Sequence, residues 1–372
     1  MGDSATVIER IEVYGYDLTY AHGDYVMSSG RVVNVLPSTV VRIRTRGGVD
    51  GFGESCPLGN TYLPAFAGGA RAALRELAPA LIGVDAANLA AVNDRMDATL
   101  LGHEYAKSAI DVACWDVLGR ATGQPVATLL GGVVEPSVPL YVAVPLGPPS
   151  EMAAFVERER ADGIHHFQLK LGGAPEADVE RVAAVHAVTG PEDALIGDAN
   201  GAWRRQDAIV AARLLAGFDR LRLEQPCPTL EECIAVRRLT TLPMVLDEVI
   251  TDLPTLVRGV AADAMDHVNL KIGRVGGLTK ARLMRDAAGA LGLTLTIEDS
   301  WGGDIVTAAV AHLAAGVSPG SLFAASFMND WTLDHVAGHQ PRSRAGRGIV
   351  PAGPGLGIDV EVETLGAPLF VS

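Results

Sequence analysis

The sequence predicts an α/β protein built around a closed parallel barrel, preceded by a smaller α+β domain. Two observations predict the barrel. Short apolar runs alternate with amphipathic helical stretches from residue 139 onward. Six of these runs end in a charged residue, at steps of roughly 25 residues, which is close to one strand–helix unit of a (β/α) barrel. A third observation, near period-2 alternation over 7–20 and 38–55, predicts strands of a separate N-terminal domain.

The N-terminal domain continues with three predicted helices. They cover 66–83, 88–102 and 105–123, and the last closes with Gly123 in the position of a helix C-cap. Because the pattern changes shortly after this glycine, we assign residues 1–128 to this domain.

The second half of the chain alternates strands and helices. The expected strands lie near 139–145, 166–170, 194–198, 221–224, 244–247, 267–271, 293–298 and 321–326. Eight strands with intervening helices favour a closed barrel, at 129–330, over an open doubly wound sheet. Neither GxGxxG nor a P-loop sequence follows a strand, which argues against nucleotide binding. The Pro/Gly-rich tail in 331–372 is predicted to form a strand pair that returns to the N-terminal domain.

Composition limits the partners of the chain. A net charge of −14 argues against a nucleic-acid surface or an anionic membrane as partner. Apolar stretches are interrupted before membrane-spanning length, and residues 1–15 lack the pattern of a signal peptide. The cysteines show no CxxC pair or zinc spacing, so we expect reduced thiols and a cytoplasmic protein; they are Cys56, Cys114, Cys227 and Cys233.

The charged residues that end the strands suggest a metal site. Strand C-termini of a barrel point to one face, so these side chains should converge there; they are Lys170, Asp198, Glu224, Asp247, Lys271 and Glu298. Asp198, Glu224 and Asp247 end successive strands, and oxygen ligands of this kind suit Mg²⁺, with Mn²⁺ as an alternative. One acidic strand end is often only a helix cap or a salt-bridge partner. Three in register between two lysines favour metal ligands.

Lys170 and Lys271 would face each other across that site. A lysine near Mg²⁺ and another cation has a lowered pKa, which lets a neutral amine act as a base. Metal coordination of a substrate carboxylate stabilises the enediolate formed when the α-proton leaves. Two bases on opposite faces permit racemisation or elimination.

These motifs resemble the enolase superfamily, and within it the muconate-lactonizing and racemase type. The matching segments are QLK ending at Lys170, DAN at 198–200, EQP at 224–226, DE at 247–248 and LKIGRVGG containing Lys271. The resemblance implies a (β/α)₇β modified TIM barrel, with a capping domain built from the N-terminal segment and the C-terminal tail. It also implies Asp198, Glu224 and Asp247 as Mg²⁺ ligands, and the two lysines as the acid/base pair.

Two positions depart from familiar patterns of this superfamily. Many relatives carry Lys-x-Lys on the second barrel strand, but the first position here is Gln168. Its amide can bind the substrate carboxylate, and the missing charge should make Lys170 more basic. The seventh strand ends in Glu298-Asp299-Ser300, without the His–Asp dyad of mandelate racemase. We expect Glu298 to orient Lys271 or a metal ligand rather than to bind the ion.

Further residues are predicted to contact the substrate. Tyr25 and Tyr62, with Phe66, lie in segments of the capping domain that can cover the barrel mouth, and Asn200 belongs to the DAN motif. Trp301 follows the seventh strand, where an indole can cover a cationic nitrogen. Together with the segments around them, these residues resemble enzymes that act on proline derivatives.

The predicted function is therefore Mg²⁺-dependent removal of an α-proton from a small carboxylate substrate. The favoured outcome is dehydration, 2-epimerisation or both, on a substrate such as cis-3-hydroxy-L-proline, with one lysine taking the proton and returning it in a syn elimination. The alternatives are 2-epimerisation of proline betaine or 4-hydroxyproline betaine, another racemase or cycloisomerase of the superfamily, and a non-catalytic barrel. FAASF on the eighth strand lacks the Asp-x-Asp of dipeptide epimerases. A homo-oligomer is expected from the resemblance.

Overall fold

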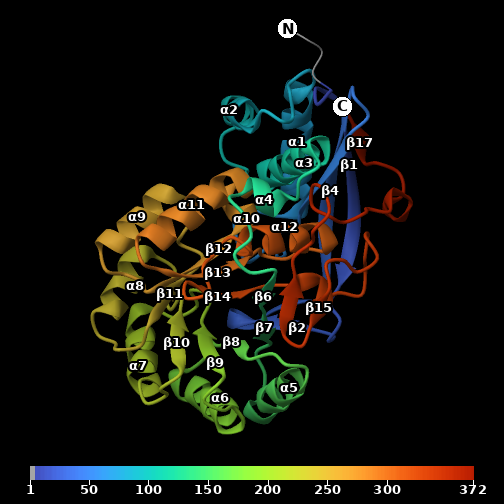
Figure 1. Ribbon diagram of the computed structural model, residues 1–372. Helices are drawn as coiled ribbons and strands as arrows, with labels where there is room; N and C mark the ends of the chain where they lie inside the picture. The colour runs from blue at the N-terminus through green and yellow to red at the C-terminus, as the bar shows by residue number, and fades with distance from the viewer. Residues whose placement is uncertain (1–4) are drawn as a thin grey trace.

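The computed structural model describes residues 5–372. Residues 1–4, which belong to the expected N-terminal domain and to the segment that lacks a signal-peptide pattern, lie outside the described residues. Figure 1 shows a barrel ringed by helices, with a capping domain of helices and long strands above it. Within residues 5–372, no helix is long and apolar enough to span a membrane.

The barrel is an eight-stranded sheet whose paired strands are all parallel. An isolated parallel bridge between Leu140 and Ala325 joins its first and last strands. The strands are β7 (Tyr141–Val144), β8 (His166–Lys170), β9 (Ala194–Asp198), β10 (Leu221–Glu224), β11 (Met244–Leu246), β12 (His267–Lys271), β13 (Thr294–Glu298) and β14 (Leu322–Ala325). This confirms the predicted closed barrel, and four of the strands have the predicted bounds.

Helices connect the strands and cover the outside of the barrel (Figure 1). They are α5 (Pro149–Ala161), α6 (Pro175–Val188), α7 (Arg205–Leu215), α8 (Leu230–Arg237), α9 (Leu253–Ala261), α10 (Ile272–Val275), α11 (Leu278–Ala290) and α12 (Asp304–Ala314). The order of elements is therefore (β/α)₇β.

The capping domain is a four-stranded sheet in the order β17-β1-β4-β5, covered by helices on one side. Its elements are β1 (Ile8–Thr19), β4 (Val35–Thr45), β5 (Asp50–Ser55), β17 (Phe370–Val371), α1 (Ala67–Leu81), α2 (Leu89–Thr99) and α3 (Glu104–Thr122). Ile11, Leu74 and Ile110 belong to its core, and all three side chains are inaccessible to solvent. The predicted C-cap at Gly123 is confirmed, with φ +68°.

Short elements complete the chain. They are β2 (Tyr25–Met27), η1 (Ser28–Gly30), β3 (Arg31–Val33), α4 (Val126–Leu129), β6 (Ser137–Pro139), η2 (Met328–Trp331), β15 (Ser343–Arg344), β16 (Arg347–Ile349) and η3 (Val362–Leu365). The strand predicted over 139–145 is divided, because β6 pairs antiparallel with β16 and β7 pairs parallel with β8. The hairpin of the tail therefore extends β6, and β17 is the strand that returns to the capping sheet.

Glu54 of β5 joins the two domains. Its carboxylate accepts hydrogen bonds from the Tyr16 and Ser38 hydroxyls and from the backbone N–H groups of Gly303 and Val306, at the start of α12. A carboxylate at a helix N-terminus is favourable because the free N–H groups are there. A Cβ on Gly303 would lie 2.2 Å from the Tyr16 hydroxyl, so glycine allows the capping sheet to approach the barrel.

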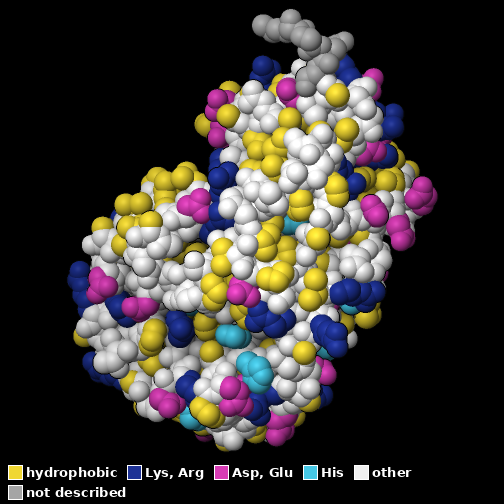
Figure 2. All heavy atoms as spheres, viewed as in Figure 1, with side chains coloured by type: hydrophobic (Ala, Val, Ile, Leu, Met, Phe, Trp, Pro, Cys, Tyr) yellow, Lys and Arg dark blue, Asp and Glu magenta, His cyan; other side chains and the backbone are white. Residues whose placement is uncertain are grey.

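The face of the molecule in Figure 2 shows acidic and basic side chains scattered together, with apolar side chains gathered over the helical layer. Several of these helices carry exposed apolar residues, such as Val257 of α9 and Leu283 of α11. Single exposed apolar side chains are common on soluble proteins.

His312 of α12 gives a testable pH dependence of stability. Its Nδ1 accepts a hydrogen bond from the Ala127 N–H and its Nε2 donates to the Leu356 carbonyl, so the buried ring is neutral. Burial lowers the pKa of His312 from 6.5 to about 4. The unfolded chain therefore binds more protons between these values. The contribution of neutral His312 to the free energy of unfolding is fully present above pH 6.5 and is lost as the pH falls through about 4.

We expect His312→Asn, which keeps an acceptor but does not titrate, to remove on the order of 3 kcal/mol of the pH dependence of the unfolding free energy. Urea unfolding between pH 4 and 7.5 measures it in both proteins. Parallel pH profiles for the variant and the natural protein would contradict the assignment, because the remaining buried histidines are common to both.

Candidate active site

The structure gathers the predicted residues at the carboxyl ends of the barrel strands. Lys170 of β8 pairs with Asp198 of β9, which pairs with Glu224 of β10. Lys271 of β12 pairs with Glu298 of β13. Because β9, β10 and β11 separate β8 from β12, the two lysines come from opposite sides of the barrel. Asp247 directly follows the last residue of β11 rather than ending that strand.

Lys170 is held by neighbours on its own side of the barrel. It is 4% exposed, and its Nζ donates to Asp198 Oδ2 at 2.5 Å and to Gln168 Oε1 at 2.9 Å. The Gln168 amide nitrogen donates in turn to both oxygens of Glu224, at 3.0 Å. Gln168 therefore links the lysine to the central carboxylate, and its amide is already used by these groups.

Lys271 has a matching environment on the other side. Its Nζ donates to both Asp247 oxygens, at 2.7 and 2.8 Å, and to Glu298 Oε1 at 2.7 Å. Glu298 Oε2 accepts a short hydrogen bond from the Tyr141 hydroxyl. Glu298 thus contacts the base candidate directly, and Tyr141 fixes its orientation.

The carboxylates determine the charge state of both lysines. Burial opposes the charged form of Lys170, but Asp198, Tyr25 and Glu224 together outweigh burial and raise the pKa of Lys170. Burial acts in the same way on Lys271, where Asp247 and Glu298 raise the pKa. The carboxylates thus raise the pKa of both lysines, whereas the expected lowering applies to a lysine beside a bound Mg²⁺. A divalent cation that shared those carboxylates would oppose the rise.

The donor set fits a hard divalent cation. The charged side chains form two hydrogen-bonded groups. The first contains Lys170, Asp198, Glu224 and Glu248, and the second contains Lys271, Arg274, Asp247 and Glu298. Together the groups hold five carboxylates and three cations, so full ionisation leaves two negative charges. Burial raises the pKa of Glu224, and the Asp198 and Asp247 charges raise it further. Oxygen ligands with excess negative charge are the preferred environment of Mg²⁺.

Glu248 was not among the predicted site residues. Burial and the Asp247 charge raise its pKa to about 7. Its Oε1 accepts a hydrogen bond from Asn200 Nδ2 at 3.1 Å, and its Oε2 is buried without a partner among residues 5–372. An unpaired buried carboxylate oxygen is costly, which again favours a cation in this place. The DE doublet at 247–248 was the available signal.

Asn200 and Tyr62 lie where the sequence placed them, near the carboxylates. Asn200, at φ +45°, donates from its Nδ2 to Asp198 at 2.8 Å and accepts from the Ser28 hydroxyl of the capping domain. The Tyr62 hydroxyl donates to Asp247 Oδ2 at 3.0 Å. Gly172 permits the approach of the capping segment, since it has φ +102° and its Cβ would lie 3.0 Å from Ser28 Cβ. One capping segment thus contacts a barrel carboxylate directly through Tyr62, and another contacts Asn200, which binds Asp198.

Trp301 packs into a cluster of aromatic rings. Its indole meets Tyr20, Tyr25 and Trp331 edge to face, with ring centroids 5.2 to 5.7 Å apart. Burial raises the pKa of Tyr25, and the neighbouring Lys170 ammonium opposes the rise, which places the cluster beside this lysine. Trp301 is 1% exposed, and its Nε1 has no partner among residues 5–372.

Two side chains needed the structure to be placed. Arg274 of α10 donates from Nη1 to the Asp247 carbonyl at 2.6 Å and to Asp247 Oδ1 at 2.7 Å, and this contact was not predicted. Phe66, expected near the substrate, lines a cavity together with Leu63. Lysine is rare in this chain, which was an unused signal: its lysines are Lys107, Lys170, Lys271 and Lys280.

A second acidic cluster lies at the opposite end of the barrel strands. His165, Glu192 and Asp193 precede β8 and β9. Arg160 pairs with Glu192 at 2.7 Å and with Asp193 at 2.8 Å, so an arginine already neutralises these carboxylates.

Comparison with known proteins assigns the class. Residues 151–364 match the family "Enolase C-terminal domain-like", and residues 15–131 match "Mandelate racemase / muconate lactonizing enzyme, N-terminal domain". The chain therefore belongs to the enolase superfamily, and it is an enzyme. This confirms the resemblance recognised in the motifs.

Individual relatives narrow the comparison. The chain is 48% identical to a cis-3-hydroxy-L-proline dehydratase of Roseibium aggregatum, over 97% of this chain and 98% of that protein. A mandelate racemase/muconate lactonizing enzyme from Roseovarius nubinhibens ISM superposes with a TM-score of 0.94 at 38% identity, over 98% of each chain. Another structure from this organism, complexed with magnesium, has a TM-score of 0.95 at 35% identity, covering 98% of this chain and 100% of that one.

Proposed function

We propose that this enzyme dehydrates cis-3-hydroxy-L-proline or a close proline derivative, using Lys170 and Lys271 as the proton-transfer groups. The observation that carries the proposal is the placement of these buried amines on opposite sides of a carboxylate cluster. The similarity to a cis-3-hydroxy-L-proline dehydratase over nearly the whole chain supports the substrate class.

Asp198, Glu224 and Asp247 are the proposed ligands of Mg²⁺, with Mn²⁺ as a possible replacement. When bound, the ion would hold the substrate carboxylate and stabilise the negative charge that develops there as the α-proton leaves. Glu298 holds Lys271 in place through its 2.7 Å contact. Gln168 keeps Lys170 at a fixed distance from Glu224, and one lysine takes the α-proton.

The stereochemistry of the substrate assigns separate tasks to the two lysines. In a cis-3-hydroxyproline the hydroxyl lies on the same face of the ring as the carboxylate, so the α-hydrogen lies on the opposite face. Loss of water is then an anti elimination. We propose that Lys170 removes the α-proton of the L-isomer and that Lys271 donates a proton to the departing hydroxyl. The syn elimination with a single lysine, expected from the sequence, does not fit this isomer.

The remaining predicted residues are proposed to orient the substrate. Asn200 and Tyr62 hold Asp198 and Asp247, and they lie close enough to the carboxylates to contact a substrate bound there. Tyr25 and Trp301 form an aromatic wall beside Lys170. The unpartnered indole N–H of Trp301 and its ring face both suit a proline ring that carries a positive nitrogen.

A second candidate is 2-epimerisation of a proline betaine. The aromatic cluster favours it, because four rings beside a base suit a quaternary ammonium that has no N–H to donate. Lysines on opposite faces also suit inversion at the α-carbon. Both candidates begin with removal of the same proton.

Proton NMR in deuterated buffer with Mg²⁺ separates the candidates. Cis-3-hydroxy-L-proline, L-proline and L-proline betaine would each be incubated with the enzyme. Loss of water from the first compound supports dehydration. Deuterium incorporation with inversion of the betaine, without loss of water from the first, supports the epimerase. Absence of both exchange and turnover on all three would refute the proposed substrate class.

Trp301 provides a test of nitrogen recognition. We expect Trp301→Leu to raise KM by roughly 5- to 30-fold, which corresponds to the loss of about 1 to 2 kcal/mol of cation–π attraction, with a smaller change in kcat. Trp301→Phe keeps an aromatic ring, so its KM should lie between that of the natural protein and that of Trp301→Leu. Steady-state kinetics on cis-3-hydroxy-L-proline measure both constants. A KM that does not change in either variant would rule out contact with the substrate.

A further inference from the structure

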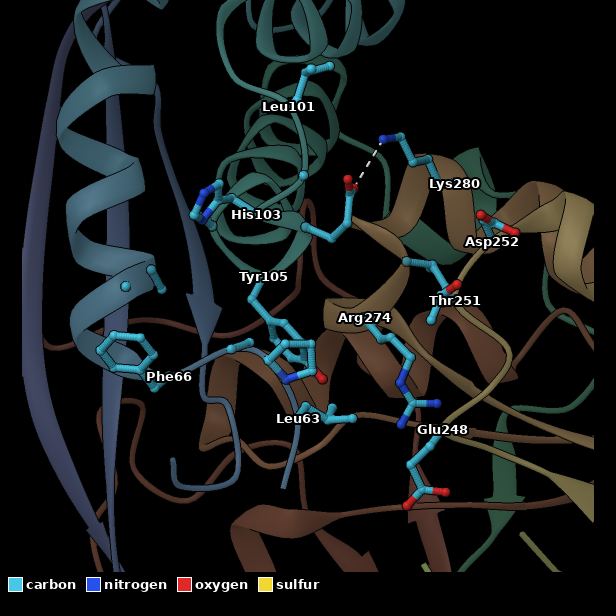
Figure 3. A pocket seen from close by; sticks show the side chains of 18 residues that line it. Leu63, Phe66, Leu101, His103, Tyr105, Glu248, Thr251, Asp252, Arg274 and Lys280 are labelled. Carbon is cyan, nitrogen blue, oxygen red and sulfur yellow. Dashed lines mark hydrogen bonds and ion pairs between the residues drawn. The ribbon is translucent and has the colours of Figure 1, made fainter. Parts of the chain in front are cut away.

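A cavity of about 660 Å³ lies between the capping domain and the barrel, on the side of β11 and β12. The capping domain contributes residues 63–66 and 101–106, and the barrel contributes the segment after β11, α10 and the start of α11. Figure 3 shows Leu63, Phe66, Leu101 and Tyr105 from one domain facing Thr251 and Arg274 from the other. Tyr62, which contacts Asp247, directly precedes residues 63–66, which line the cavity.

Arg274 brings unused donors to this cavity. The side chain is 4% exposed, and its Nη1 is occupied by Asp247. Its Nε and Nη2 are buried and have no partner among residues 5–372. These two nitrogens form one edge of the planar guanidinium, the edge that binds a carboxylate through two parallel hydrogen bonds. Buried donors without partners are rare, so these two nitrogens are available to the acceptor of a ligand.

The wall opposite the guanidinium is apolar. Phe66 is 49% exposed and Leu101 is 87% exposed, although both side chains line the cavity. Val275 and Leu63 continue this surface. A ligand with a hydrocarbon body would cover these side chains while its polar end met Arg274, as in most small-molecule sites.

The other charges limit the ligand to a single negative charge. Lys280 is paired with Glu104 at 3.2 Å, as the dashed line in Figure 3 shows. Glu248 and Asp252 add two carboxylates to the lining. A dianion such as phosphate would meet repulsion from these carboxylates, and Arg274 supplies the buried donors without partners. The arrangement therefore suits a monocarboxylate.

We propose that this cavity is a second binding site, for a small monocarboxylate with an apolar body, and that Arg274 connects it to Asp247. A carboxylate on the Nε and Nη2 edge would share the positive charge that now neutralises Asp247. Asp247 would then hold a divalent cation more tightly, and by thermodynamic linkage the cation would strengthen binding in the cavity.

Benzoate is a suitable probe, measured by isothermal titration calorimetry on the whole protein without metal. We expect Arg274→Lys, which loses the two-nitrogen edge but keeps the charge, to weaken benzoate binding at least 10-fold. Leu101→Glu, at the exposed edge, should weaken it at least 5-fold. The matched control is Leu283→Glu on α11, since Leu283 is 56% exposed and outside the cavity lining. Equal weakening by both glutamates, or no detectable binding of benzoate, would overturn the proposal.

A crystal soaked in 4-bromobenzoate locates the ligand directly. An anomalous bromine signal between Phe66, Leu101 and Val275 supports the site. A signal confined to the surroundings of Lys170 and Lys271, or no signal, overturns it. Titration of benzoate with and without Mg²⁺ tests the connection between the cavity and Asp247. We expect benzoate to bind at least threefold more tightly when Mg²⁺ is present. Equal affinities would refute the link through Arg274.

Discussion

Replacing Lys170 or Lys271 by alanine is expected to lower kcat/KM for dehydration of cis-3-hydroxy-L-proline by roughly 10²- to 10⁴-fold. The loss follows from the anti elimination, in which the α-proton leaves from one face and the hydroxyl from the other. Each lysine is the only lysine on its side of the barrel mouth within the described residues, since Lys107 and Lys280 belong to α3 and α11. Steady-state kinetics with Mg²⁺ give the ratio.

Deuterium exchange separates the roles of the two amines. Lys170→Ala should abolish exchange of the α-proton of the L-substrate, because the proposed base is missing. Lys271→Ala should keep that exchange while losing dehydration and any inversion at the α-carbon. The control is Arg213→Ala, which removes an exposed cation of α7 and should change neither. Inversion that survives in Lys271→Ala would disprove the assignment of two bases.

Removal of the divalent metal should also abolish activity, with recovery on addition of Mg²⁺ or Mn²⁺. The physical reason is the excess of two negative charges over the two hydrogen-bonded groups together, in which five carboxylates face only three cations among the described residues. We expect Glu224→Gln to raise the dissociation constant for Mn²⁺ by roughly 100-fold or more, because it removes a full charge from the centre of the donor set. Electron paramagnetic resonance of Mn²⁺ measures the affinity without turnover.

Glu231→Gln is the matched control for this substitution. Glu231 lies on α8, directly after the strand and loop that carry Glu224, and its side chain is 72% exposed. It should leave the Mn²⁺ affinity within about twofold, since exposed charges are screened by salt. An unchanged dissociation constant in Glu224→Gln would exclude this glutamate as a metal ligand.

The arrangement of the barrel mouth was accessible from local patterns. A parallel barrel brings every strand end to one face, so a charged residue that closes an apolar run needs no tertiary information to be placed. Lys170, Asp198, Glu224, Lys271 and Glu298 end their strands as expected from that rule. The fold class and the superfamily followed from the same pattern, because the strand period and the motifs agree.

Contacts between elements distant in the chain were not accessible in this way. Lysine charge is one example: the carboxylates that raise the pKa of Lys271 come from two neighbouring strands, and their effect depends on distances of a few ångströms. The role of Gln168 is another. Its amide lies between Lys170 and Glu224 because β8 and β10 flank β9, so its hydrogen bonds follow from packing.

The spacing of residues along the chain thus indicates the barrel, the carboxylate cluster and the paired lysines, because periodic backbone geometry converts sequence position into position on the rim. Packing of the capping domain on the barrel decides the rest. It places Trp301 among the aromatic rings, leaves two Arg274 nitrogens without partners, and opens a cavity beside Phe66. These features arise where elements distant in the chain meet, and such contacts depend on side-chain shape, which no local pattern records.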